Sequence, residues 1–276
     1  MKIQIDPHAL QREALRRRAQ GQRIGFVPTM GYLHRGHTSL LSLARDRCDW
    51  LVASIYVNPL QFAPTEDLAA YPRDPEGDAE KCREHGVDCL FMPEALYLPE
   101  HRTRVGVDGL SLGLCGGSRP THFEGVTTVV ARLFGLVQPT VSVFGEKDYQ
   151  QLTLIRRMVA DLAMPIEIVG GPLVRDTDGL ALSSRNAYLN SKERSRAVTI
   201  YQTLCHLRTR VQAGVLDTEA LVQSALSELQ VDQLDYLEIR DGLSLEPLRT
   251  VQPGARAFAA AWVGRPRLID NLELLS

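Results

Sequence analysis

Short apolar runs rich in β-branched residues alternate along the first 174 residues with segments in which apolar residues recur every three or four positions. The apolar runs predict strands buried on both faces, at residues 23–30, 49–58, 87–93, 140–148 and 166–174. The intervening segments predict helices at residues 37–48, 78–86, 121–139 and 148–165. Strands and helices in this order are typical of the α/β class, with a parallel sheet flanked by helices.

Capping signals mark where two of the helices begin. Asp6 before Pro7 predicts an N-cap with proline at the first helical position, and Gly21 predicts the end of that helix. Thr121 and Glu124 have the spacing of a capping box, in which each side chain bonds the other residue's backbone N–H.

The pattern changes after residue 180. Two polar helices, from about residue 191 and over residues 217–230, precede candidate strands at residues 234–241, 256–264 and 266–274. This order predicts a smaller α+β C-terminal domain. Turn and breaker residues in "GGPLVRDTDG" mark the boundary, and we predict one domain over residues 1–174 and a second over residues 175–276.

The composition limits the partners that these domains can have. The 276 residues suffice for a large core, and 31 Lys and Arg against 33 Asp and Glu leave no broad cationic surface for nucleic acid. An anion site must therefore be local. The five cysteines form no C-x-x-C pair, and their odd number favours reduced thiols. Because neither a signal-peptide core nor an apolar run of membrane-spanning length occurs, the sequence predicts a cytoplasmic protein with no membrane partner.

The sequence "PTMGYLHRGH", residues 28–37, lies where a predicted strand turns into a predicted helix. Open α/β sheets bind ligands at this carboxyl edge, and the free N–H groups and dipole of the helix favour negative charge there. His34 and His37 can face one ligand, while Gly36 leaves the backbone open to a nucleotide. A single histidine here is more often a capping or packing residue, but the pair favours a phosphate site with imidazole donors. Neither a Walker loop nor a G-x-G-x-x-G motif occurs.

A second polar segment, "FGEKDYQQL", spans the end of a later strand and the start of its helix at residues 144–152. Lys147 can meet a phosphate as a point charge. Asp148 can accept a hydrogen bond from ribose hydroxyls, and its spacing to Gln151 equally suits a helix cap. Both roles stay open for this carboxylate.

A third segment, "DGLALSSRN", covers residues 178–186. Ser183, Ser184 and Arg185 can surround phosphate oxygens with hydroxyl, backbone and guanidinium donors. Most S-S-R tripeptides are surface loops, so this segment supports a phosphate site only in combination with the other two segments.

These segments, with "VNPLQF", "YPRD", "HFEGVTTVV" and "RLIDN", resemble in order the signature segments of the pantoate–β-alanine ligase (pantothenate synthetase) family. The resemblance runs from Pro28 to Asn271. It implies a Rossmann-like fold within the broader H-x-G-H group of adenylate-forming and nucleotidyl-transferring enzymes, with a second domain that closes over the nucleotide. It further implies an ATP-dependent ligase, with Mg²⁺ and a homodimeric assembly.

The implied reaction has two halves. Pantoate and ATP give pantoyl adenylate and pyrophosphate, and β-alanine then attacks the adenylate to give pantothenate, a coenzyme A precursor, and AMP. The first half needs no base, because a carboxylate with a pKa near ~4 is already ionised at neutral pH. The sequence indicates no base for the β-alanine amine in the second half.

The family pattern also implies the site residues. Catalytic roles fall to His34, His37, Lys147 and Arg185, with His37 as proton donor. ATP binding is assigned to Met30, Gly31, Tyr32, Leu33, His34, Arg35, Gly36, His37, Gly145, Glu146, Lys147, Asp148, Val174, Leu182, Ser183, Ser184 and Arg185. Pantoate binding is assigned to Gln61 and Gln151, whose neutral amides can bond hydroxyls and a carboxylate. No protein cage for Mg²⁺ is evident, and Asp78 is the candidate ligand.

Two residues depart from the family pattern. Arg35 occupies a position where glutamate is common, and Leu182 replaces the usual methionine. We expect Arg35 to point outward, and Leu182 keeps the apolar volume.

Two other classes of function remain. An adenylyltransferase acting on a phosphorylated acceptor would use the same H-x-G-H turn without pantoate, and a non-catalytic ATP-binding module would bind nucleotide without turnover. An aminoacyl-tRNA synthetase is disfavoured, because no basic anticodon-binding region follows.

Overall fold

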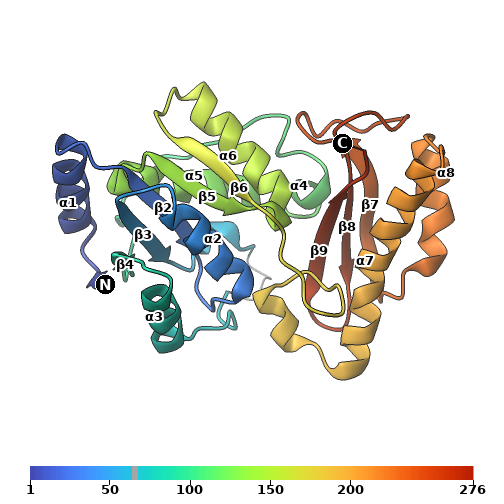
Figure 1. Cartoon of the computed structure of the whole chain (residues 1–276), viewed down its shortest axis with the longest axis horizontal. Helices are drawn as coiled ribbons and strands as arrows, with labels where there is room; N and C mark the ends of the chain where they lie inside the picture. Colours follow the sequence, from blue (N-terminus) through green and yellow to red (C-terminus); the bar gives the residue numbers. More distant parts are fainter. Residues whose placement is uncertain (64–67, 276) are drawn as a thin grey trace. The chain divides into compact units, whose positions relative to one another are not determined.

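The computed structural model describes residues 1–63 and 68–275, which form two compact units (Figure 1). Unit 1 comprises residues 1–111, 119–146 and 151–172, and unit 2 comprises residues 112–118, 147–150 and 173–276. Each unit therefore contains segments that are distant in the sequence.

Unit 1 is built on a six-stranded parallel sheet with the strand order β1-β4-β3-β2-β5-β6. The strands are β1 (Lys2–Gln4), β2 (Ile24–Thr29), β3 (Trp50–Ile55), β4 (Cys89–Phe91), β5 (Val141–Gly145) and β6 (Glu167–Gly171). The helices are α1 (Pro7–Ala19), α2 (Arg35–Arg45), α3 (Pro75–Glu84), α5 (His122–Val137) and α6 (Tyr149–Asp161). The predicted α/β class with a parallel sheet is confirmed, although the short strand β1 was not predicted.

Helices cover both faces of this sheet, which explains the continuous apolar runs of its central strands. On one face, Val27 and Leu51 belong to a buried cluster with Leu41 of α2 and Cys82 of α3. On the other face, the ring of Phe26 meets that of Phe134 of α5 edge-on, at 6.3 Å between centroids. The central strands are therefore fixed from both sides, and loops at their ends have a rigid base.

Unit 2 has an antiparallel sheet in the order β7-β8-β9. Its elements are α4 (Leu114–Ser118), α7 (Ser191–Gln212), α8 (Thr218–Ala225), β7 (Gln233–Asp241), β8 (Ala255–Trp262) and β9 (Arg267–Glu273). The alanines on one face of β8 leave room for α7, and both elements contribute to one apolar core. The predicted smaller α+β part is thus observed, with α8 shorter than the predicted helix because a 3-10 turn, η4 (Leu226–Glu228), follows it.

The N-cap prediction holds at one helix and fails at another. Asp6 accepts a hydrogen bond from the backbone N–H of His8 and caps α1 as predicted. The predicted capping box at Thr121 is wrong, because this residue has helical rather than extended dihedral angles, with φ −96° and ψ −7°. The backbone N–H of His122 bonds the carbonyl of Arg119 instead, so the chain enters α5 through a tight turn.

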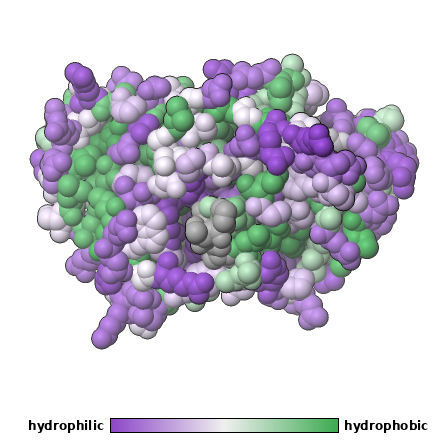
Figure 2. Space-filling view, turned by 180° about the vertical axis from the view of Figure 1, so that it is seen from behind, coloured by the Kyte–Doolittle hydropathy of each residue, from purple (hydrophilic) through white to green (hydrophobic). Residues whose placement is uncertain are grey.

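Hydrophilic residues are spread over the face of the molecule shown in Figure 2, with hydrophobic residues between them. Within residues 1–63 and 68–275, no helix has the length and apolar character needed to cross a membrane.

Candidate active site

Three neighbouring strands of unit 1 direct their carboxyl ends to one edge of the sheet (Figure 1). The H-x-G-H turn follows β2, the 3-10 turn η1 (Pro59–Gln61) follows β3, and Gly145 ends β5. Because Thr29 and Ile55 are paired in the parallel ladder, the first two segments begin at the same level. Gln61 and the two histidines of the motif therefore share the edge at which α/β sheets bind ligands.

His34 and His37 form a reciprocal capping box at the start of α2. His34 is extended and accepts the backbone N–H of Gly36 at its Nδ1, at 3.1 Å, while Nδ1 of His37 accepts the backbone N–H of His34 at 3.3 Å. The ring centroids lie 4.1 Å apart. Since each Nδ1 accepts, the proton of each neutral ring lies on Nε2. The capping role is thus observed, and it prepares both rings as Nε2–H donors.

The backbone between β2 and α2 is held by Asp78 of α3. Its carboxylate accepts the N–H of Tyr32 at 2.7 Å and that of Leu33 at 2.6 Å, one at each oxygen. The Asp78 side chain is 1% exposed. Gly31 and Tyr32 both have positive φ, 87° and 53°, and a Cβ at Gly31 would press on Ile55 and Asp78. The turn is therefore a strained conformation fixed by a buried anion.

Asp78 does not fit the expected role of a Mg²⁺ ligand, because both of its oxygens already accept backbone N–H groups. Within the described part of the chain, no group of three or more His, Cys, Asp or Glu residues could hold a metal ion. Burial raises the pKa of Asp78, and the two N–H groups oppose that rise. The sequence signal for its role in holding the loop is its place beside Ala79 and Cys82 on the buried face of α3.

Gln61 is 8% exposed and is held through its backbone. Its carbonyl accepts hydrogen bonds from Nδ1 of His122, at 3.0 Å, and from the guanidinium of Arg119, at 3.1 Å. These two residues stand at the entrance to α5 and were not predicted as site residues. Gln151, the other residue assigned to pantoate, lies half-buried in the first turn of α6.

The turn that presents Gln61 depends on Asn58 and Gly125. Asn58 caps η1 by accepting the N–H of Leu60 at 3.3 Å, and its side-chain amide donates to the carbonyl of Gly125 at 3.0 Å. A Cβ at Gly125 would overlap the carbonyl oxygen of Leu60, so α5 can approach this turn only at a glycine. Sequence reasoning missed both residues, although "VNPLQF" and "HFEGVTTVV" contain them.

The remaining predicted residues of unit 1 lie at the same edge. Met30 follows β2, and Arg35 is exposed at the first position of α2, as expected for an outward-pointing side chain. Gly145 ends β5, and the side chain of Glu146 lies against Gly170 of β6.

In unit 2, Lys147 and Asp148 belong to the 3-10 turn η2 (Glu146–Asp148). The Lys147 Nζ lies 3.6 Å from the Asp148 carboxylate, in an ion pair that is partly exposed. Because the turn runs directly into α6, Asp148 does not have the extended backbone of an N-cap. The capping alternative for Asp148 is therefore not met.

The S-S-R segment is an ordered loop of unit 2. The backbone N–H of Leu182 donates to the carbonyl of Val174 at 3.0 Å, which places these two residues, both predicted to bind ATP, side by side. Ser183 caps a 3-10 turn, η3 (Ser184–Tyr188), by accepting the N–H of Arg185 at 3.3 Å. Ser184 is 9% exposed. The structure thus assembles the predicted residues into two groups, one in each unit.

A parallel sheet with a capped H-x-G-H turn at its carboxyl edge defines an α/β protein of the Rossmann-like, nucleotide-binding class. Within that class the chain belongs to the pantoate–β-alanine ligase family, whose model matches residues 2–273. The predicted family, fold class and ligase activity are confirmed.

Relatives and solved structures agree along the whole chain. The sequence is 50% identical to a pantothenate synthetase of Pseudomonas savastanoi pv. phaseolicola over 94% of each chain, and 50% identical to one of Oleidesulfovibrio alaskensis over 100% of each. The crystal structure of pantothenate synthetase from Thermus thermophilus is similar with a TM-score of 0.94 and 46% identity, covering 100% of both chains. A pantoate–β-alanine ligase from Francisella tularensis, complexed with β-γ ATP and β-alanine, has a TM-score of 0.81 and 33% identity, covering 99% of this chain and 98% of that one.

Proposed function

We propose that this chain condenses pantoate with β-alanine to pantothenate through a pantoyl-adenylate intermediate, releasing pyrophosphate and AMP. The observation that carries the proposal is the 50% identity to a pantothenate synthetase over 100% of both chains. The capped H-x-G-H turn supports it, because it supplies oriented donors at the sheet edge where phosphates bind.

In the first step, a carboxylate oxygen of pantoate attacks the α-phosphorus of ATP, and the bond to the bridging oxygen of pyrophosphate breaks. The free-energy barrier of this step arises from repulsion between the negatively charged reactants and from the need to align the attacking oxygen with the α-phosphorus. We assign the Nε2–H groups of His34 and His37 to the phosphate oxygens. As a neutral ring, His37 keeps its proton and acts as donor by hydrogen bonding to the departing pyrophosphate. Lys147 and Arg185 add positive charge at the phosphates.

The remaining predicted residues are assigned to pantoate, to adenine or to the phosphates. Gln61 and Gln151 bind pantoate through neutral amides, which leave its carboxylate reactive. Val174 and Leu182 frame the adenine, and Ser183 and Ser184 bind phosphate oxygens together with the backbone of residues 30–37 and 145–148.

In the second step, the amine of β-alanine attacks the acyl carbon of the adenylate, and AMP leaves. Only the neutral amine has the electron pair for this attack. We attribute the acceleration to positioning in a closed site that shields the mixed anhydride from water, with the predicted second domain closing over the nucleotide.

We further propose that ATP enters with Mg²⁺, which neutralises phosphate charge, and that the chain forms a homodimer in the cytoplasm. The free state of all five cysteines supports a reducing compartment.

The decisive experiment is exchange of labelled pyrophosphate into ATP. Exchange that requires pantoate supports the proposal, and its absence with folded protein and Mg²⁺ would remove it. Exchange without pantoate would favour an adenylyltransferase, and ATP binding without exchange a non-catalytic module. Replacing Lys147 by alanine should lower the exchange rate by at least ~100-fold with the thermal midpoint unchanged.

A further inference from the structure

The motif "RLIDN", residues 267–271, lies on β9 and has no substrate role in the proposed reaction. Two of its three polar residues, Asp270 and Asn271, are only 5% and 4% exposed. Buried polar side chains are retained where they satisfy specific partners, so their contacts within unit 2 indicate what the motif does.

Asn271 uses both ends of its side-chain amide. The amide nitrogen donates to the carbonyl of Lys147 at 3.0 Å, and the amide oxygen accepts from the guanidinium of Arg256 at 2.7 Å. Arg256 in turn lies over the ring of Tyr149, at 4.0 Å, two residues after Lys147. The amide donates to the carbonyl while accepting from the guanidinium, and a carboxylate of the same shape would repel the carbonyl oxygen.

Asp270 holds the other candidate segment of unit 2. Its two oxygens accept from the two terminal nitrogens of Arg175, at 2.6 Å and 2.8 Å. Arg175 also donates to the carbonyl of Gly179 at 3.1 Å and lies over the ring of Tyr201 at 3.6 Å. Burial raises the pKa of Asp270, and the paired guanidinium opposes that rise. The ion pair therefore fixes the start of the loop that leads to Ser183.

We propose that Asp270 and Asn271 are positioning residues, and that β9 is the common support for Lys147 and for the S-S-R loop. Neither residue touches substrate. The inference rests on the proposed function, because it assigns ATP phosphates to the two supported segments. Asn271 fixes the backbone of η2 and hence the direction of the Lys147 side chain, while Asp270 fixes the loop through Arg175.

The test is a double-mutant cycle on the full chain, with the ATP dissociation constant measured by calorimetry in the presence of Mg²⁺. Asn271→Asp keeps the size of the side chain and its bond to Arg256 but removes the donor to Lys147. It should weaken ATP binding ~10-fold in the unaltered chain and less than ~2-fold in a Lys147→Ala background. An equal loss in both backgrounds would mean general destabilisation and would overturn the proposal.

Two further variants serve as a matched control and as a substitute if Asn271→Asp does not fold. Asn190→Asp makes the same chemical change at an exposed cap of α7 in the same unit, where only an acceptor is needed, and should leave ATP affinity unchanged. If Asn271→Asp does not fold, as judged by its thermal midpoint, Asn271→Ala removes the donor to Lys147, together with the acceptor of Arg256, without adding charge. It should show the same dependence on Lys147.

Failure of the proposed function can be recognised separately. A chain that binds ATP but shows no pantoate-dependent exchange loses the ligase assignment, while the cycle still reports on Asn271 through binding alone. A chain that does not bind ATP overturns both.

Discussion

The two edges of the parallel sheet in unit 1 use polar side chains in different ways. At the carboxyl edge, Asp78, His34 and His37 all accept hydrogen bonds from backbone N–H groups of one turn. At the amino edge, where Lys2 and Trp50 begin their strands, polar side chains bond one another and backbone groups of several separate segments.

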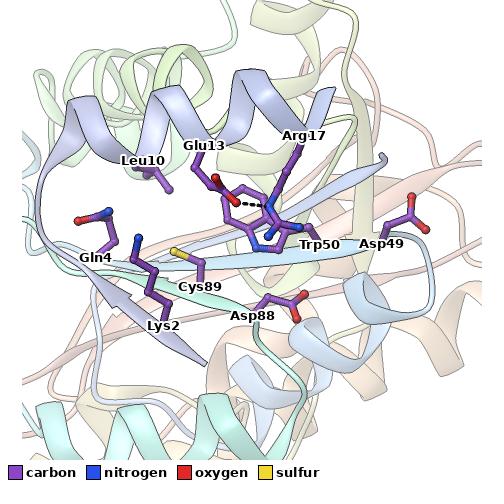
Figure 3. Close-up of a pocket in the computed structure, with 9 residues that line it drawn as sticks. All are labelled: Lys2, Gln4, Leu10, Glu13, Arg17, Asp49, Trp50, Asp88 and Cys89. Atoms are coloured by element: carbon purple, nitrogen blue, oxygen red, sulfur yellow. Dashed lines mark hydrogen bonds and ion pairs between the residues drawn. The ribbon is translucent and has the colours of Figure 1, made fainter. Parts of the chain in front are cut away.

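A pocket of about 230 Å³ lies at this amino edge, and Figure 3 shows its lining. Glu13 of α1 bonds Arg17 at 2.7 Å, and the Arg17 guanidinium lies 4.5 Å from the centroid of the Trp50 ring. Asp88 pairs with Arg45, also at 2.7 Å.

Asp88 also accepts the backbone N–H of Leu51, and Asp49 that of Arg23. These bonds hold separate segments, whereas the three side chains at the other edge converge on a single turn. A ligand site needs donors whose positions are set in advance. The proposed function therefore places the reaction at the carboxyl edge, where two imidazoles are held by one turn, and not at the pocket of the amino edge.

The largest effect is expected at His37. Replacing it by alanine removes an Nε2–H donor and one half of the capping box, and pantoate-dependent exchange should fall by at least ~100-fold. The lost cap should cost only ~1 kcal/mol of unfolding free energy. Exchange kinetics and thermal unfolding of the same preparation separate the two effects. Unaltered exchange in this variant would contradict the assignment of the reaction to the carboxyl edge of the sheet.

A smaller effect is expected from Asp78→Asn. One oxygen becomes an NH₂ group that faces a backbone N–H, so the turn loses an acceptor, and ATP affinity should fall ~10-fold at neutral pH. Because burial raises the Asp78 pKa, the unaltered carboxyl also gains a proton at a higher pH than an ordinary aspartate. The ATP affinities of the two proteins should therefore converge as the pH falls.

The sign of this pH effect distinguishes loosening of the turn from unfolding. A raised pKa means that Asp78 favours the folded state most below its ordinary value, and that this contribution is lost as the pH rises through the raised value. Acid should thus weaken ATP binding through this group without weakening the fold. Affinities of variant and unaltered chain that stay parallel down to acid pH would contradict the assignment.

Gly125→Ala should act mainly on pantoate. The added methyl group overlaps the carbonyl of Leu60, and relief by a shift of η1 would displace Gln61. We expect the KM for pantoate to rise several-fold and the unfolding free energy to fall by ~1–3 kcal/mol. Gly135→Ala in the same helix is the matched control, because open space surrounds that position. If both variants change the KM for pantoate and the unfolding free energy equally, the overlap with Leu60 is not the cause.

The smallest effect is expected from Glu13→Gln at the amino edge. Its hydrogen-bonded pairing with Arg16 lowers the pKa of Glu13 from 4.5 to about 2. The ion pairs therefore stabilise the fold fully above pH 4.5, and this contribution is lost as the pH falls towards about 2. Because they are largely solvated, the variant should lose less than ~1 kcal/mol at neutral pH, with unaltered exchange. Chemical denaturation across pH measures this, and a loss of exchange would show that the amino edge takes part in the reaction.

The elements that the sequence could predict are those specified by short-range patterns of residues. The strands β2 to β6 and the H-x-G-H turn follow from short-range patterns, namely apolar runs and a motif after a strand. β1 has three residues and exists through pairing with β4, so no local periodicity indicates it. Thr121 has the spacing of a cap, yet the Arg119 turn before α5 gives it a helical backbone.

The supports of the candidate site were the least predictable part. Asp78 contacts a turn 45 residues earlier in the sequence, and Asn58 contacts α5, 67 residues later. A motif states which residue types are present, but the partner of a buried polar group depends on the tertiary fold. The roles proposed for the motif residues themselves follow from family resemblance.

The hydrogen bond from Asn271 joins residues 124 positions apart. During synthesis, the ribosome therefore completes every strand of the parallel sheet, and the turn that contains Lys147, long before it delivers the strand that supports that turn. On the proposal above, a nascent chain that still lacks β9 binds nucleotide only weakly, and full affinity is acquired once β9 has been added.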